Sequence, residues 1–236
     1  LDTLGCFGRS IEDVALGVAA MSGDHALATI EGMHHKPRIS ICKTADWEYA
    51  DKDTAAALAL ARFSAEKIAT GLVDDLTLPD VYNDLRQVQT RIMLSEMSRS
   101  LAFEREHYAK KLSPLITKQI DEGNRIPYSQ YSQDLISANA ARRDIVDLFH
   151  NQTDIIIAPS ATGEAPLIKD GTGDPVFCRI WTLLGLPCIN VTVSNGANGL
   201  PIGVQLIAGP GQDRLLLSVA RAFALALPDP ILRDQA

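Results

Sequence analysis

The sequence predicts an α/β protein in which a mixed sheet is covered by helices. Apolar residues at helical spacing alternate along the chain with short apolar runs, and the β-branched run Asp154–Pro159 is typical of a central strand. Two later apolar runs are separated by Asn195–Gly199, whose Gly and Asn residues favour a turn between antiparallel strands. With 236 residues, of which 46% are hydrophobic, the chain can bury a sizeable core.

The first elements are marked by caps and breakers. Ser10–Asp13 has the spacing of a capping box, and helical periodicity follows until Gly23. Ile39–Cys42 is short and apolar, as expected of a buried strand. An Ala-rich helix is predicted over residues 51–70, and an alternating strand over Leu72–Leu78, which Pro79 stops.

The middle of the chain is predicted to be helical and more polar. Residues 81–130 carry breaks at Ser113–Pro114 and Gly123–Pro127, so we expect two or three helices lying over one side of the core. The remaining elements are predicted in the order helix Tyr131–His150, strand Asp154–Pro159, loop Ser160–Gly173, helix Asp174–Leu184, strand Pro187–Ser194, strand Ile202–Ile207 and helix Asp213–Leu227. No repeat or linker is found, so residues 1–236 are predicted to form a single domain.

The composition argues against several classes of protein. A net charge of -7 is a poor match for a nucleic-acid partner, and no apolar run approaches the roughly 20 residues of a membrane helix. The four cysteines lack the close spacing of a zinc site, and we interpret them as reduced residues of a cytoplasmic protein. His34–His35 fits a solvated pair better than a metal site, so no metal and no cofactor are predicted.

Ser160, just after the predicted central strand, and Asp174, at the start of the next predicted helix, are candidates for a binding site. Ser160 directly follows this strand, at a position where α/β sheets bind ligands. It is interpreted either as a residue that lines a pocket or as part of a simple turn at the strand end. The least favoured interpretation is a nucleophile, which would need a nearby Lys or His as its base. Asp174 precedes Pro175 and either caps the following helix or presents its carboxylate to a pocket.

Several stretches together resemble the amidase signature family. Residues 1–16, LDTLGCFGRSIEDVAL, are similar to the family pattern S-L-D-T-x-G-x-x-A-R-S-V-E-D-x-A. Four later stretches resemble, in order, the C-terminal half of the family: Asp154–Ala161, Thr172–Phe177, Trp181–Pro187 and Asn198–Ile207. The last of these is similar to the family pattern N-G-L-P-x-G-x-Q-L-x. Residues 81–130 are the part that matches poorly.

This resemblance implies part of an α/β/α sandwich and hydrolysis of a carboxylic amide C–N bond through an acyl-serine. In the family a lysine acts as base, a bridging serine sits in a cis peptide, a second serine is the nucleophile, and backbone amides stabilise the oxyanion. Those groups belong upstream of Leu1, so the chain is expected to be the C-terminal portion of an amidase, to contain no catalytic residue and to be inactive alone. Its expected partners are a small-molecule amide and the missing N-terminal segment. Without that segment we expect the chain to expose an open strand edge or an apolar patch, and a homo-oligomer is possible.

The resemblance also suggests which side chains face the substrate. Ser160, Thr162, Asp174 and Phe177 are the candidates for substrate binding, with Trp181 a weaker one; the alternative is that all five merely pack or cap. Two other functions stay open. The chain could be a non-catalytic binding or scaffold module of amidase fold, or a glutamyl-tRNA amidotransferase A-type subunit, although Thr172–Pro175 and Trp181–Gly185 look more like free-standing amidases.

Overall fold

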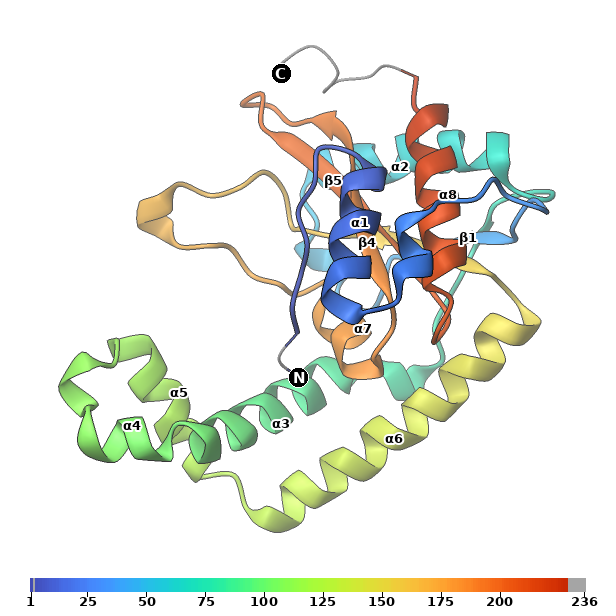
Figure 1. Ribbon diagram of the computed structural model, residues 1–236. Helices are drawn as coiled ribbons and strands as arrows, with labels where there is room; N and C mark the ends of the chain where they lie inside the picture. Colours follow the sequence, from blue (N-terminus) through green and yellow to red (C-terminus); the bar gives the residue numbers. More distant parts are fainter. Residues whose placement is uncertain (2, 229–236) are drawn as a thin grey trace.

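The computed structural model describes residues 1 and 3–228 and is built around a mixed sheet with helices on both faces (Figure 1). Asp2, part of the N-terminal motif, and residues 229–236, the end of the predicted domain, lie outside the described residues. The sheet has the order β2-β1-β3-β5-β4. Its strands are β1 (Ile39–Ile41), β2 (Asp74–Asp75), β3 (Ile155–Pro159), β4 (Cys188–Asn195) and β5 (Pro201–Ala208).

The strand directions match the predicted mixed sheet. β1 runs parallel to β2 and β3, while β5 is antiparallel to both β3 and β4. The predicted hairpin is confirmed: β4 and β5 pair with Val191 opposite Val204, and an irregularity between Thr192 and Ser194 shifts the register. In the described sheet β2 and β4 are each paired on one side only, so both are edge strands.

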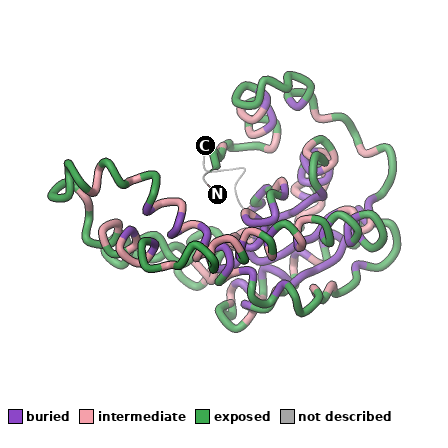
Figure 2. The backbone as a smooth tube through the Cα atoms, turned by 90° about the horizontal axis from the view of Figure 1, so that it is seen from below, coloured by how far each residue is buried: buried purple, intermediate pink, exposed green. Residues whose placement is uncertain are grey.

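The helices form two layers because alternate strand residues face opposite sides of the sheet. Their bounds are α1 (Ile11–Ser22), α2 (Lys52–Ile68), α3 (Leu85–Ser100), α4 (Ala102–His107), α5 (Pro114–Asn124), α6 (Tyr128–Asn151), α7 (Arg179–Leu184) and α8 (Asp213–Ala226). Ile155 and Ile157 pack with α1, α2 and α8, whereas Ile156 and Ala158 pack with α3, α6 and α7. Figure 2 shows the buried segments gathered in this central region.

The predicted caps of the first helix are present. The hydroxyl of Ser10 accepts a hydrogen bond from the backbone N–H of Asp13 at 3.1 Å, and Gly23 ends α1 with φ of 75°. Thus the local signals at both ends of this helix were sufficient to place it.

Three predicted elements differ from the structure. The strand predicted over Leu72–Leu78 is reduced to the two residues of β2, because β1 offers pairing partners only to Asp74 and Asp75. The helix predicted from Asp174 begins at Arg179, so Asp174 is not its N-cap. The long helix α6 begins directly after Pro127, earlier than the predicted Tyr131.

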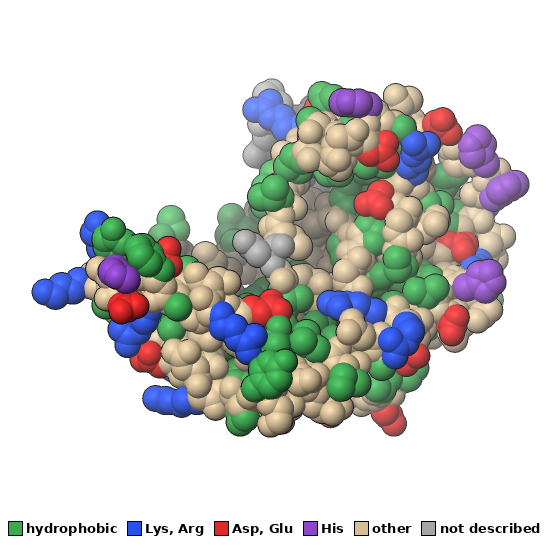
Figure 3. All heavy atoms as spheres, turned by 60° about the horizontal axis from the view of Figure 1, so that its bottom comes forward, with side chains coloured by type: hydrophobic (Ala, Val, Ile, Leu, Met, Phe, Trp, Pro, Cys, Tyr) green, Lys and Arg blue, Asp and Glu red, His purple; other side chains and the backbone are tan. Residues whose placement is uncertain are grey.

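The polar helical region does not lie wholly over the core. α3 packs on α6 and α7, but α4 and α5 continue from the far end of α3 and lie away from the sheet (Figure 1). α5 approaches α3 closely at Gly123, where a Cβ atom would lie 2.0 Å from the carbonyl oxygen of Leu94. Figure 3 shows the molecule hollowed between this end and the body that contains the sheet. No helix within residues 1 and 3–228 has the length and apolar character needed to cross a membrane.

Candidate functional site

The carboxyl end of β3 is the centre of the candidate site. β1 and β3 are parallel, so residues that follow Ile41 and Pro159 lie at the same edge of the sheet. The strand on the other side of β3, β5, runs in the opposite direction, so β3 has a parallel neighbour on one side and an antiparallel neighbour on the other. Open α/β sheets bind ligands outside the carboxyl ends of their strands, which is where Ser160 lies.

Ser160 is held by the strand beside it. Its hydroxyl donates to the carbonyl oxygen of Gly203 at 2.9 Å, and its own carbonyl oxygen accepts from the thiol of Cys178 at 3.3 Å. Burial raises the pKa of the Cys178 thiol, which therefore stays protonated and able to donate. Among the described residues no Lys or His side chain bonds to Ser160, so nothing there activates it as a nucleophile.

The junction is completed by Gln205, which the sequence analysis did not single out. This side chain is 4% exposed, and its amide nitrogen donates to the carbonyl oxygens of Pro159 at 2.7 Å and Phe177 at 2.8 Å. A polar residue inside the apolar run of β5 was the available signal.

Thr162 lies in the loop that leaves this junction and extends away from the sheet (Figure 1). It lines a hollow of about 690 Å³ together with Tyr49, Asp53 and Glu164. The carboxylate of Glu164 accepts from the backbone N–H groups of Asn198 and Leu200 at 3.0 and 2.9 Å. The loop is thereby attached to the turn between β4 and β5.

Asp174 belongs to a charged cluster. Its carboxylate pairs with Arg179 at 3.1 Å, and Arg179 also donates to the hydroxyl of Thr90 on α3 at 3.0 Å. Nearby, Arg86 pairs with Asp46 at 2.9 Å. Burial raises the pKa of Asp46 against the opposing effect of Arg86 and Arg179, and Asp174 raises it further.

The two aromatic candidates are buried in the described structure. Phe177 and Trp181 are each 1% exposed, and Trp181 packs in the apolar cluster of α3, α6 and α7. The indole N–H of Trp181 has no hydrogen-bond partner among the described residues. Packing, one of the two interpretations left open by the sequence, accounts for both side chains as they stand.

The face of β4 that is turned away from α8 provides an open polar surface. Ile189, Val191 and Val193 point toward α8, whereas the intervening Asn190 is exposed and Thr192 is only partly buried. A Cβ atom at Gly203 would lie 2.5 Å from the Asn190 side-chain oxygen, so the glycine lets that amide lie across β5. Alternation of polar and apolar residues along β4 was the signal for this surface.

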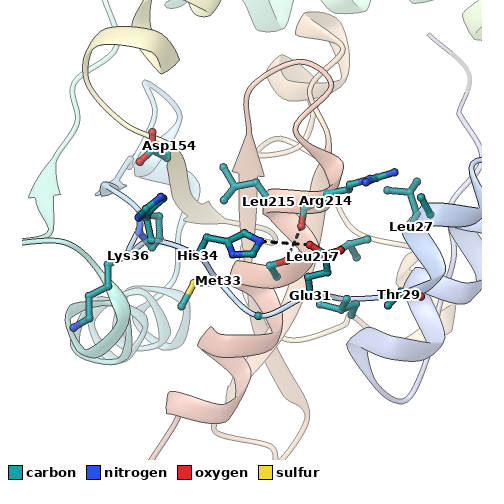
Figure 4. Close-up of a pocket in the computed structure, with 16 residues that line it drawn as sticks. Leu27, Thr29, Glu31, Met33, His34, Lys36, Asp154, Arg214, Leu215 and Leu217 are labelled. Carbon is teal, nitrogen blue, oxygen red and sulfur yellow. Dashed lines mark hydrogen bonds and ion pairs between the residues drawn. The ribbon is translucent and has the colours of Figure 1, made fainter.

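A separate cavity of about 330 Å³ lies between the segment 26–37 and the start of α8 (Figure 4). It adjoins Asp154, before β3, and so lies at the opposite end of that strand from Ser160. His34 points toward Glu31, with which it pairs at 3.5 Å, and Lys36 points away. Glu31 is a carboxylate near His34 that the sequence analysis overlooked. No cluster of three or more metal-ligating side chains occurs in the part of the chain that is described.

Comparisons with known proteins agree on one family. The family described as Amidase matches residues 1–217. In Mus musculus, the A-type subunit of the mitochondrial glutamyl-tRNA(Gln) amidotransferase is 31% identical over 118 residues, which are 44% of this chain and 22% of that protein.

Solved structures share the fold. A chain from a vestigial protein complex, described as revealing the origins of an s-triazine catabolic enzyme, superposes with a TM-score of 0.76 and 24% identity over 92% of this chain. The 6-aminohexanoate cyclic dimer hydrolase complexed with substrate gives a TM-score of 0.72 and 18% identity over 97% of this chain. These matches cover 52% and 56% of the two solved chains, so the present chain spans about half of each.

Proposed function

We propose, from the premise that this chain belongs to the amidase signature family, that it is the C-terminal part of an amidase domain that hydrolyses a carboxylic amide C–N bond. The nucleophilic serine, the bridging serine and the lysine base lie in polypeptide that precedes residue 1. The amide carbon is attacked by the serine, the amine leaves with a proton, and water then releases the acid.

One observation carries this proposal: the family match covers residues 1–217, yet within the described part of the chain no base bonds to Ser160. Its hydroxyl donates to a backbone carbonyl instead. The unpaired edge of β4 also supports it, because that edge leaves room for further strands to extend the sheet.

In this proposal the described residues form one wall of the substrate site. Ser160 stands at the end of β3, Thr162 lines the hollow under the loop, and Asp174 presents a half-exposed carboxylate beside Arg179. Phe177, which is 1% exposed, supports this wall by packing behind it. The substrate is a small-molecule amide. We place the protein in the cytoplasm, which its four free cysteines support.

The test compares amide hydrolysis by residues 1–236 alone with hydrolysis by the complete protein that contains them. We expect no turnover by the chain alone, and turnover by the complete protein. Ser160→Ala in the complete protein should lower kcat/KM by about tenfold or less, because a binding side chain contributes far less than a nucleophile. Turnover by the chain alone that Ser160→Ala abolishes would contradict the proposal.

A second candidate is an amidotransferase A-type subunit, which the similarity to the mouse amidotransferase protein favours. It differs in one measurable respect. Stable copurification of the complete protein with a tRNA-binding subunit would support this function, whereas hydrolysis of a free amide without any partner supports the first.

A further inference from the structure

Gln205 joins two segments that are distant in sequence. It lies in β5, opposite Ala158 of β3 and Asn190 of β4. Its neighbours Val204 and Leu206 face the layer of α1, α2 and α8, so the Gln205 side chain faces the other layer, beneath the segment that leads into α7.

The two acceptors of Gln205 stand where regular structure ends. Pro159 is the last residue of β3, and Phe177 lies shortly before α7 begins. Both carbonyl oxygens take their hydrogen bond from the same amide group, at 2.7 and 2.8 Å. Each distance is that of a well-formed hydrogen bond.

The adjoining residues strengthen the same connection. Ser160 follows Pro159 and bonds back to Gly203 of β5, and Cys178 follows Phe177 and bonds to the Ser160 carbonyl oxygen. Three segments, 159–160, 177–178 and 203–205, are therefore tied together by side-chain bonds in a buried place. Loss of a buried donor leaves its acceptors unsatisfied, which costs more than the bond itself contributes.

We propose that Gln205 is a positioning residue of the candidate site: through Pro159 and Phe177 it fixes the spacing between Ser160 and the segment before α7. Its role toward a substrate rests on the proposed amidase function. Its role in ordering the wall is independent of that function and can be measured on the chain itself.

Two backbone amides report on the wall. The N–H of Asp51 donates to the carbonyl oxygen of Thr162 at 2.8 Å, and the N–H of Cys178 donates to that of Pro175 at 2.9 Å. If Gln205 fixes this region, Gln205→Leu should accelerate hydrogen exchange at both amides by about tenfold relative to the amides of α2.

Gln89 provides the matched control. It is also a buried glutamine, 6% exposed, but it lies on α3. Among the residues that the structure describes, its side-chain oxygen has no partner and its amide nitrogen reaches only the Met93 sulfur, at 3.9 Å. Gln89→Leu should leave exchange at Asp51 and Cys178 unchanged. Equal acceleration in the two variants, or none in Gln205→Leu, would overturn the proposal.

Gln205→Glu gives a pH signature that a purely packing role does not produce. A carboxylate placed against two carbonyl oxygens and shielded from water has a raised pKa, and only its protonated form can donate to one of them. Exchange at the two amides should therefore be fast at neutral pH and slow down as the pH falls, after correction for intrinsic exchange. No pH dependence beyond that of the unsubstituted chain, or loss of the whole fold in both variants at every pH, would contradict the proposal.

The kinetic arm uses the complete protein. If the wall binds ground state and transition state alike, Gln205→Leu should raise KM by about tenfold and change kcat little. A loss confined to kcat would contradict this part. If the unsubstituted protein hydrolyses no amide, the proposed function fails, while the exchange and pH measurements still decide the role of Gln205.

Discussion

Replacing Asp134 is expected to lower the free energy of unfolding by about 3 kcal/mol, because its carboxylate anchors α6 to α3. Asp134 is 2% exposed and accepts from two nitrogens of Arg91, Nε at 2.8 Å and Nη2 at 2.7 Å. Gln130 donates a third hydrogen bond at 3.0 Å. α3 in turn packs on α7, which follows Asp174 and Phe177 in the chain.

The expected loss of unfolding free energy depends on how deeply Asp134 and Arg91 are buried. Removing one partner of a buried ion pair costs about 3–5 kcal/mol, because the remaining charge is left unpaired. The Arg91 side chain is 35% exposed and can regain water once Asp134→Ala removes the carboxylate, which places the expected cost at the low end.

The assay is a double-mutant cycle measured by urea unfolding, with Asp134→Ala, Arg91→Met and the combination. We expect a coupling energy of about 2 kcal/mol. Arg105 and Asp121 form a matched pair between α4 and α5, at 3.1 Å but 38% and 42% exposed, and their coupling should stay below about 1 kcal/mol. Equal coupling in the two cycles would refute the reasoning from burial.

Three further predictions concern an ion pair, a close contact between helices and a buried thiol. Burial raises the pKa of Asp154, but the side-chain and backbone donors of Arg38 outweigh it and hold that pKa below its usual value. The carboxylate therefore stabilises the fold above about pH 4, and the roughly 1 kcal/mol lost in Asp154→Asn at pH 7 should shrink as the pH falls below 4. A loss that stays constant down to the lowest pH at which the protein is folded would count against it. Gly123→Ala should cost about 2 kcal/mol by pushing α5 off the Leu94 carbonyl, whereas Gly17→Ala in α1, which meets only the movable thiol of Cys6, should be neutral or slightly stabilising in thermal unfolding. Burial raises the pKa of Cys42 to about 11, so alkylation at pH 8 followed by peptide mass spectrometry should label Cys6 at least about a hundredfold faster, and equal rates would contradict the burial.

Local signals in the sequence located much of the fold. Ser10 and Gly23 bound α1 through interactions within a few residues, and the β-branched run of β3 is buried on both faces, as its composition predicts. The hairpin of β4 and β5 follows from the turn residues between them.

Long-range contacts decided what the sequence could not place. Asp174–Pro175 has the local character of a helix start, yet the chain stays irregular up to Cys178 while Gln205, 28 residues from Phe177, holds its carbonyl. The charged cluster likewise joins Asp46, Arg86 and Arg179 from three separate parts of the chain. No pattern within a short window encodes such partners.

Covalent labelling locates the nucleophilic serine. A serine-directed fluorophosphonate should be reacted with residues 1–236 and with the complete protein, and the labelled serine identified by peptide mass spectrometry. The account predicts no labelling of residues 1–236 in either sample, and labelling of a serine that precedes them in the complete protein. A phosphonylated Ser160, or any other labelled serine within residues 1–236, would contradict it.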